Sequence, residues 1–277
     1  MKKHLVPSVT LSNGVTMPQV GLGTWPLRGT DAARAVRSAL DVGYRLIDTA
    51  EAYENEEAVG QGIRDAGVPR DEIFVTTKFN RQWHSVEGAR LACEASLARL
   101  RVDYLDLLLI HWPNPDQNRY IDAFEGLVRL LERGVVRAIG TSNFKTSHLQ
   151  RLFDAGFVPH VNQIQLDPWH PRTDVVAVHE EKRIVTEAWS PLGRAGEMLA
   201  DPRIEAVARR HGRTPAQIVL RWLTQRGFVA APKSADPGRQ RSNIEIFDFA
   251  LDDEELAAIG RLERADPAML DADQFGH

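Results

Sequence analysis

The chain has 277 residues, of which 43% are hydrophobic and 26% are charged. This balance is typical of a globular protein of about one to two domains and excludes a disordered or fibrous chain. Lys and Arg number 34 against 38 Asp and Glu, a net charge of -4 that argues against a dedicated nucleic-acid binder. A single cysteine, Cys93, excludes an intramolecular disulfide framework and a multi-cysteine zinc site.

The sequence also predicts where the protein is located in the cell and how many domains it has. No apolar run approaches the roughly 20 residues of a membrane-spanning helix, and the start of the chain has no apolar stretch of signal-peptide length. We therefore expect a soluble, cytoplasmic protein with no membrane or nucleic-acid partner. No linker divides the chain and nothing demands a second subunit, so we expect one domain over residues 1–277 and a monomer.

The chain opens with a predicted hairpin, in which residues 9–11 and 15–17 flank Asn13-Gly14, a pair preferred by the tight type I′ turn. Eight short runs rich in β-formers follow, and we expect a strand at each. The runs are residues 19–23, 45–48, 73–78, 105–110, 136–140, 161–164, 184–189 and 228–231.

Helical patterns lie between these runs. Residues 31–42 have an apolar face and end before Gly43, a typical C-terminal stop. Ser85 is expected to cap a helix with Leu91 among its apolar positions. Two further helices are expected to start at the pairs Asp201-Pro202 and Thr214-Pro215, in which a capping side chain precedes a first-turn proline.

Eight strands that alternate with helices predict parallel βαβ units. At this length an eightfold repeat favours a closed (β/α)8 TIM barrel in the α/β class, here with an N-terminal β-hairpin and extra C-terminal helices. A doubly wound open sheet is the alternative fold.

Polar and aromatic residues follow every predicted strand. In a (β/α)8 barrel the reacting groups come from these C-terminal strand ends, so we expect the side chains to gather at one face. In chain order they are Thr24-Trp25, Asp48 (with Tyr53 five residues on), Lys78, His111-Trp112, Ser142-Asn143, Gln163, Trp189-Ser190 and Lys233-Ser234.

Lysine is rare in this chain, since only six of the 34 basic residues are lysines. Two of them, Lys78 and Lys233, nevertheless lie at predicted strand ends. Arg is a planar fork, whereas Lys is a compact point charge on a thinner stem. A site that needs one ammonium beside a phenol or a phosphate therefore has reason to keep lysine.

Asp48, Tyr53, Lys78 and His111 have a joint chemical interpretation. The pKa of a tyrosine hydroxyl is about 10, and a neighbouring ammonium lowers it by stabilising the phenolate. Asp48 can supply the counter-charge that a buried Lys78 needs, and His111 can donate a hydrogen bond to a substrate oxygen. Any one of these residues alone would usually be structural, but four at successive strand ends indicate a catalytic cluster.

Several ordered motifs between about Val9 and Leu262 resemble those of the aldo-keto reductases, especially the bacterial 2,5-diketo-gluconate reductase-like members. The similar segments are GYRLIDTAEAYENEEAVG (43–60), TTK (76–78), IHWP (110–113), IGTSNF (139–144), VNQIQ (161–165), WSPLG (189–193) and PKSADPGRQRSN (232–243).

This resemblance implies an NADPH-dependent reduction of small aldehydes or ketones, with diketo sugar acids and methylglyoxal-like carbonyls among the substrates it suggests. By similarity Tyr53 is the general acid, Lys78 and Asp48 tune it, and His111 orients the carbonyl. The resemblance also implies a set of cofactor-binding residues: Thr24, Ser142, Asn143, Gln163, Trp189, Ser190, Leu192, Gly193, Lys233, Ser234, Arg239 and Asn243.

Within that set, Lys233, Ser234 and Arg239 match the family's clamp on the 2′-phosphate, which favours NADPH over NADH. Two departures bear on the clamp. Asp236 places a carboxylate inside this loop, and Ser242 stands where many relatives use glutamate. By the same resemblance, the substrate pocket is framed by Trp25, Phe79, Trp83 and Trp112, and the tail after Leu262 closes at most one side of it.

Other functions have weaker support in the sequence. GLGTWP (21–26) begins like a dinucleotide-binding fingerprint but lacks its third glycine. The short-chain dehydrogenase spacing of Tyr and Lys is missing, and no His-x-His or His-Glu-x-x-His motif supports a zinc hydrolase, so we expect no metal. A non-catalytic NADPH-binding sensor of the same fold is the remaining alternative.

Overall fold

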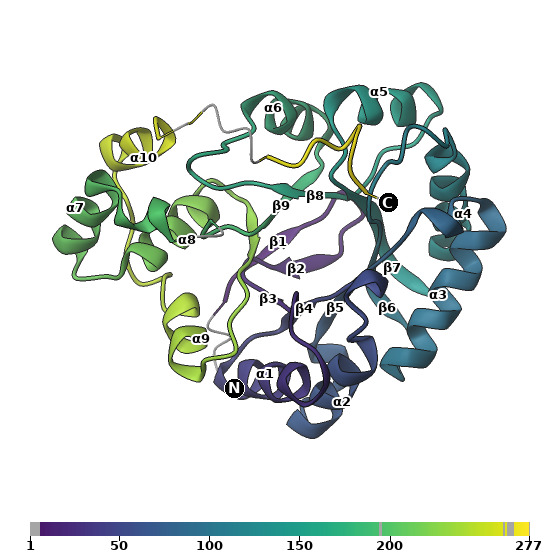
Figure 1. Ribbon diagram of the computed structural model, residues 1–277, viewed down its shortest axis with the longest axis horizontal. Helices are drawn as coiled ribbons and strands as arrows, with labels where there is room; N and C mark the ends of the chain where they lie inside the picture. Colours follow the sequence, from purple (N-terminus) through teal and green to yellow (C-terminus); the bar gives the residue numbers. More distant parts are fainter. Residues whose placement is uncertain (1–5, 194–195, 263, 265–268, 277) are drawn as a thin grey trace.

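Eight parallel strands follow one another around a barrel in the computed structural model of the chain, which describes residues 6–193, 196–262, 264 and 269–276 (Figure 1). Each strand pairs with the next along the chain, as the barrel prediction requires. The strands are β3 (Leu22–Gly23), β4 (Leu46–Asp48), β5 (Phe74–Phe79), β6 (Leu105–Ile110), β7 (Val136–Ser142), β8 (Val161–Gln165), β9 (Val185–Trp189) and β10 (Val229–Ala231).

Backbone hydrogen bonds join the first strand to the last and so favour the barrel over the open sheet. Ala230 N donates to Gln19 O over 2.9 Å, and Gly21 N donates to Ala230 O over 2.9 Å. A Cβ at Gly23 would lie 2.6 Å from the backbone oxygen of Ala231. Only glycine allows the two chain segments to approach so closely at this seam.

Helices surround the barrel, and most of them connect successive strands (Figure 1). They are α1 (Gly29–Val42), α2 (Glu56–Ala66), α3 (Val86–Leu100), α4 (Tyr120–Glu132), α5 (Thr146–Asp154), α6 (Thr173–Lys182), α7 (Pro202–His211), α8 (Pro215–Gln225), α9 (Pro237–Ile244) and α10 (Asp253–Gly260). Short 3-10 turns are η1 (Glu51–Tyr53), η2 (Arg70–Glu72), η3 (Arg81–Trp83) and η4 (Glu197–Ala200). None of the described helices is long and apolar enough to span a membrane.

The predicted helix ends are confirmed. Gly43 ends α1 with φ 117°, and Ser85 Oγ accepts a hydrogen bond from Gly88 N at the start of α3. Asp201 and Thr214 cap α7 and α8 in the same way. Two helices lie outside the regular strand–helix alternation of the barrel. Helix α10 follows the last strand–helix repeat, as expected, and α7 is inserted between β9 and α8.

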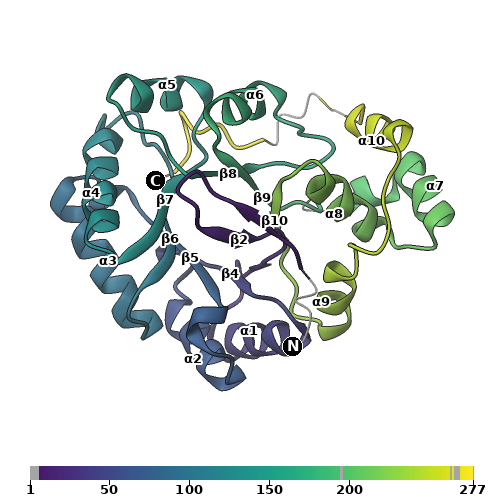
Figure 2. The ribbon, with the colours of Figure 1, turned by 180° about the vertical axis from the view of Figure 1, so that it is seen from behind.

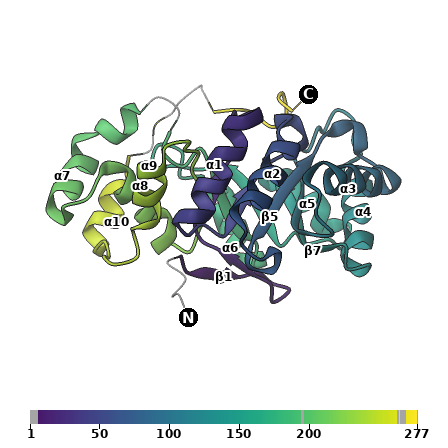
Figure 3. The same ribbon diagram turned by 90° about the horizontal axis from the view of Figure 1, so that it is seen from below.

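The N-terminal hairpin, β1 (Ser8–Thr10) and β2 (Thr16–Pro18), crosses one end of the barrel, opposite the end where the described C-terminal residues lie (Figures 2 and 3). Its turn is not type I′, because Gly14 has φ 86° but Asn13 has no positive φ. Instead Gly14 N donates to Leu11 O and Leu11 N donates to Val15 O, the pattern of a longer loop with glycine at its left-handed position.

Two apolar clusters fix the barrel. The larger lies between the strands and the helices. The smaller fills the barrel interior beside the hairpin, where Leu11 and Met17 pack against Leu46, Phe74 and Val161. In α3 the buried face uses small residues such as Ala92 and Cys93, whereas Leu91, one of the expected apolar positions, is 41% exposed.

Candidate active site

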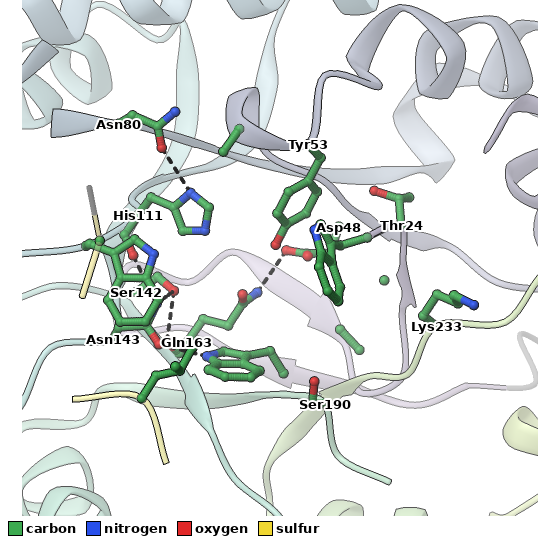
Figure 4. A pocket seen from close by; sticks show the side chains of 18 of the residues that line it. Thr24, Asp48, Tyr53, Asn80, His111, Ser142, Asn143, Gln163, Ser190 and Lys233 are labelled. Atoms are coloured by element: carbon green, nitrogen blue, oxygen red, sulfur yellow. Dashed lines mark hydrogen bonds between the residues drawn. The ribbon is translucent and has the colours of Figure 1, made fainter. Parts of the chain in front are cut away.

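A cavity of about 350 Å³ opens at the end of the barrel away from the hairpin (Figure 4). Its wall comes from the residues at or just after the strand ends, and from the chain's C-terminal residues. It is lined by Gly23, Thr24, Trp25, Asp48, Ala52, Tyr53, Asn80, His111, Trp112, Ser142, Asn143, Gln163, Trp189, Ser190, Ala231, Lys233, Leu270, Phe275 and Gly276. Most of the predicted site residues therefore gather in one place.

Lys78 lies just below this cavity and is 1% exposed. Its Nζ donates to both carboxyl oxygens of Asp48, each over 2.8 Å, and to the backbone oxygen of Thr49 over 2.9 Å. The Tyr53 hydroxyl is 3.5 Å from the same Nζ. Because β4 and β5 are adjacent parallel strands, their C-terminal ends bring the carboxylate and the ammonium together.

The charges in this cluster are set by burial and by each other. Burial disfavours the ammonium of Lys78, but the nearby acidic groups, with Asp48 foremost, together outweigh it and raise the pKa of Lys78 above its ordinary value. Burial also raises the pKa of Tyr53, and the Lys78 ammonium only partly opposes this change. The expectation of a net more acidic phenol is therefore not met. Tyr53 stays protonated at neutral pH beside a cation that can stabilise its phenolate.

His111 faces Tyr53 across the cavity, with the two rings edge to face and 5.8 Å between their centroids. Burial, helped by the Lys78 ammonium, lowers the pKa of His111 to about 3, so the ring is neutral at physiological pH. Its Nδ1 lies 3.2 Å from Oδ1 of Asn80 (Figure 4). A neutral imidazole carries one proton, and the orientation of the Asn80 amide decides which nitrogen holds it.

Asn80 is absent from the residues predicted by the sequence, although its position just after β5 is the signal that marked the others. We expect Asn80→Leu, which removes both hydrogen-bonding groups at similar size, to lower kcat/KM for a carbonyl substrate about tenfold. Asn118→Leu, which changes an asparagine outside the cavity wall, is the control. Unchanged kinetics in Asn80→Leu would show that Asn80 does not orient His111.

Amide and hydroxyl groups line the side of the cavity formed by β7, β8 and β9. Asn143 has φ 64°; its Nδ2 donates to His111 O over 3.0 Å, and its Oδ1 accepts from Trp189 Nε1 over 2.8 Å. Gln163 Nε2 donates to Asp48 Oδ2 over 2.8 Å, and Ser142 Oγ donates to Gln163 O over 3.0 Å (Figure 4). One hydrogen-bond network thus connects this side to the Asp48–Lys78 pair.

A group of cations lies at the start of α9. Lys233 and Arg239 are exposed, and their side chains make no ion pair with any other residue that the structure describes. Asp236 caps α9, because its Oδ1 accepts a hydrogen bond from Arg239 N over 2.7 Å. The carboxylate that departs from the expected phosphate clamp therefore has a local structural role.

The other predicted cofactor residues do not form the wall of the cavity. Ser234 Oγ and Asp236 N are 3.2 Å apart in the turn before α9. Asn243 is buried near the end of that helix. Leu192 packs at the edge of the larger apolar cluster, and Gly193 has φ 69° in the loop after β9.

Two of the four predicted aromatic walls line the cavity. Trp25 is 56% exposed at its mouth, and Trp112 lies beside His111. Phe79 follows Lys78 in β5, and the alternation of strand side chains turns it outward into the larger apolar cluster. Trp83 lies outside the cavity wall, where its Nε1 donates to Glu51 Oε1 over 2.8 Å.

The C-terminal residues close one side of the cavity, as expected. Phe275 packs edge to face on Trp112, with ring centroids 5.0 Å apart, and Asn114 Nδ2 donates to Gly276 O over 2.7 Å. An ion pair and a hydrogen-bond contact hold this segment from outside, since Asp273 pairs with Lys145 Nζ at 2.6 Å and lies 2.9 Å from His148 Nε2. Across the described ranges, no group of three or more His, Cys, Asp or Glu could hold a metal ion.

Comparisons with known proteins agree with this geometry. Residues 19–264 match the model of the Aldo/keto reductase family. The chain is 44% identical to methylglyoxal reductase DkgA of Salmonella typhimurium over 97% of this chain and 98% of that relative. It is also 44% identical to 2,5-diketo-D-gluconic acid reductase B of a Corynebacterium species over 94% of both chains.

The chain is also similar in fold and sequence to solved structures. A mutant of Gox0644 in complex with NADPH has a TM-score of 0.92 and 41% identity, and the match covers 97% of this chain and 98% of that one. A family match over residues 19–264, two relatives at 44% identity and a barrel with these strand-end residues are mutually consistent. The chain belongs to the aldo/keto reductase family.

Proposed function

We propose that this protein reduces small aldehydes and ketones to alcohols with NADPH as the reductant. The observation that carries the proposal is the convergence of Tyr53, His111 and the buried Lys78–Asp48 pair at one cavity. Family membership and the NADPH complex of a similar structure support the same activity. Tyr53 would be the proton donor, His111 would orient the carbonyl, and Lys78 and Asp48 would stabilise the developing phenolate.

The residues around the cavity fit a nicotinamide dinucleotide phosphate. Ser142, Asn143 and Gln163 offer hydroxyl and amide groups suited to a carboxamide, and the Trp189 indole is fixed by its bond to Asn143. The exposed cations at α9, Lys233 and Arg239, with Ser234 nearby, suit a phosphate group. When bound, NADPH supplies a hydride to the carbonyl carbon.

The proton side of the reaction follows from the charges of the cluster. Burial keeps Tyr53 in its protonated form, because it raises the pKa of the hydroxyl, which can donate to the carbonyl oxygen as negative charge develops there. The phenolate that remains lies 3.5 Å from the Lys78 ammonium, which stabilises it. Asp48 keeps Lys78 charged and in place. These donors are held before substrate arrives, which limits reorganisation during the reaction.

The cavity suits small molecules and selects loosely among them. Trp25, Trp112 and Phe275 give it stiff apolar walls. Among its described lining residues there is no buried cation at the mouth that would require a negatively charged substrate. The names of the two bacterial relatives suggest methylglyoxal and diketo sugar acids as first substrates to test. We propose small dicarbonyl compounds as the preferred class.

A substrate panel with NADPH at neutral pH tests this function. We expect NADPH consumption and stoichiometric alcohol formation with at least one small dicarbonyl compound. NADPH binding without consumption on any carbonyl would contradict the enzyme and favour the sensor alternative.

Cofactor choice has its own test. Lys233→Ala is expected to weaken NADPH binding at least about tenfold, because a charge-assisted contact to the 2′-phosphate is lost, while NADH binding changes little. Lys182→Ala, at a partly exposed lysine on α6, is the control. Equal loss for NADPH and NADH, or equal use of both by the unmutated protein, would reject the phosphate clamp.

A further inference from the structure

Glu187 is a buried carboxyl group inside the barrel that the proposed mechanism does not use. Successive side chains of β9 point to opposite faces of the strand. The Thr186 side chain points outward, where its Oγ1 contacts His179 Nδ1 at 2.8 Å. Glu187 therefore points into the barrel, as Val185 and Trp189 do. Val185 packs against the interior apolar cluster, and Trp189 lines the cavity. Glu187 therefore lies between the apolar floor of the barrel and the cavity.

Within the described part of the chain, no cation or strong donor binds this carboxyl group. Glu187 is 0% exposed, and neither of its oxygens makes a hydrogen bond of good geometry to another described residue. Gln163 is its register partner on β8, but the well-aligned hydrogen bond of the Gln163 amide goes to Asp48 (Figure 4). Burying an uncompensated carboxylate is costly, so the group is kept as a neutral acid.

The groups that face Glu187 are Asp48 from β4, Lys78 from β5 and Tyr53 from η1. Asp48 and Lys78 form an ion pair, of which the Asp48 charge acts more strongly on Glu187 than the Lys78 charge, and Tyr53 is neutral. On the other side, β10 contributes the apolar Val229. Burial, with the nearby Asp48 charge, raises the pKa of Glu187 to about 8, while the Gln163 amide and the Lys78 ammonium oppose the change.

We propose that the proton of Glu187 is coupled to the charge of the bound cofactor: Glu187 is neutral with NADPH and ionises when NADP⁺ occupies the site. The inference rests on the proposed function. Its neighbours Gln163 and Trp189 both line the predicted nicotinamide pocket, and oxidation makes that ring cationic. An ionised Glu187 would stabilise the cation through the low-dielectric interior.

Two different protons are involved, one in catalysis and one on Glu187. Carbonyl reduction takes one proton at Tyr53 and one hydride from NADPH. The proton of Glu187 is separate: it passes to solvent when NADP⁺ is bound and returns when NADPH replaces it. By linkage, the same coupling must make the affinity for NADP⁺ depend on pH.

The test measures dissociation constants of NADP⁺ and NADPH between about pH 6.5 and about pH 9.5 by titration. Their ratio is used because both cofactors carry the same phosphates, whose own titration cancels. In the unmutated protein we expect binding of NADP⁺, relative to NADPH, to tighten about tenfold over this range. In Glu187→Gln, which keeps the size and removes the charge, the ratio should be constant.

A matched control is Glu56→Gln, since Glu56 is also a buried carboxyl but lies outside the barrel, paired with Arg99. Its ratio should follow that of the unmutated protein. Calorimetry of the unmutated protein in buffers of different ionisation enthalpy gives a second measurement, independent of any variant. At about pH 7.5 it should show proton release with NADP⁺ and none attributable to Glu187 with NADPH.

The outcomes separate the two proposals. Binding of neither cofactor would overturn the proposed function, and the coupling with it. Binding of both with a ratio that is independent of pH would overturn the coupling alone, as would a Glu187→Gln protein with the same pH dependence as the unmutated one.

A measurement without cofactor checks the neutral state of Glu187 by itself. A folded-state pKa raised above the unfolded value contributes stability that is lost as pH rises through that raised value. The melting temperature of the unmutated protein should therefore fall relative to Glu187→Gln between about pH 5 and about pH 9. A constant difference would show that Glu187 is already ionised.

Discussion

Tyr53→Phe is expected to lower kcat for carbonyl reduction by at least about two orders of magnitude, the usual contribution of a general acid. The substitution removes one oxygen and little volume. NADPH affinity should hardly change, because the hydrogen bond of this hydroxyl among the described residues is to Lys78, which is not assigned to the cofactor. Steady-state kinetics and a cofactor titration measure the two effects separately.

Tyr104→Phe is the control for this change, since Tyr104 stacks on Arg70 away from the cavity. It should retain full activity. A Tyr53→Phe protein that reduces carbonyls at the unmutated rate would dismiss Tyr53 as the proton donor.

Lys78→Met has a large expected effect on both stability and activity. It leaves the Asp48 carboxylate, whose side chain is only 6% exposed, without its cation. Removing one partner of a buried ion pair typically costs about 3–5 kcal/mol of unfolding free energy. Activity should also fall by at least about two orders of magnitude, because no ammonium remains to stabilise the Tyr53 phenolate.

The double variant Asp48→Asn/Lys78→Met separates these two effects. It removes both charges, so chemical denaturation should show most of the stability restored. The activity should not return. A double variant that is as unstable as Lys78→Met would mean that the cost lies in packing rather than in the unpaired charge, and an active Lys78→Met protein would exclude Lys78 from catalysis.

The barrel is predictable because each repeat carries its own local signal. The run at residues 105–110 coincides with β6, and the caps Ser85, Asp201 and Thr214 begin helices where expected. Strand ends bring side chains together in any closed parallel barrel. For this reason the sequence alone groups Asp48, Lys78 and Gln163.

The wrong predictions come from details that sequence patterns do not encode. Asn13-Gly14 favours two turn types, and the choice of the longer loop depends on how the hairpin fits the barrel. Resemblance places Phe79 in the substrate pocket, although its neighbour Lys78 occupies the inward direction. Leu91 is one of the apolar positions expected in α3, but the helix packs through Ala92 and Cys93 and leaves Leu91 exposed.

The charge state of the site also requires three-dimensional information. The sequence predicts an ammonium beside a phenol, but only the burial of Tyr53 shows that desolvation outweighs that ammonium and raises the pKa of the phenol. In the sequence, Glu187 is one residue of a predicted strand. Its significance comes from its burial without a well-aligned hydrogen bond or an ion pair to another described residue, which no spacing rule reports.

The most direct test of the account is a single turnover with NADPH deuterated at the transferable position, with methylglyoxal as substrate and mass analysis of the alcohol. The account predicts one deuterium on the new carbinol carbon for each NADPH consumed, and a rate at least about a hundredfold lower in Tyr53→Phe. Alcohol without deuterium, or an equal rate in the variant, would contradict it.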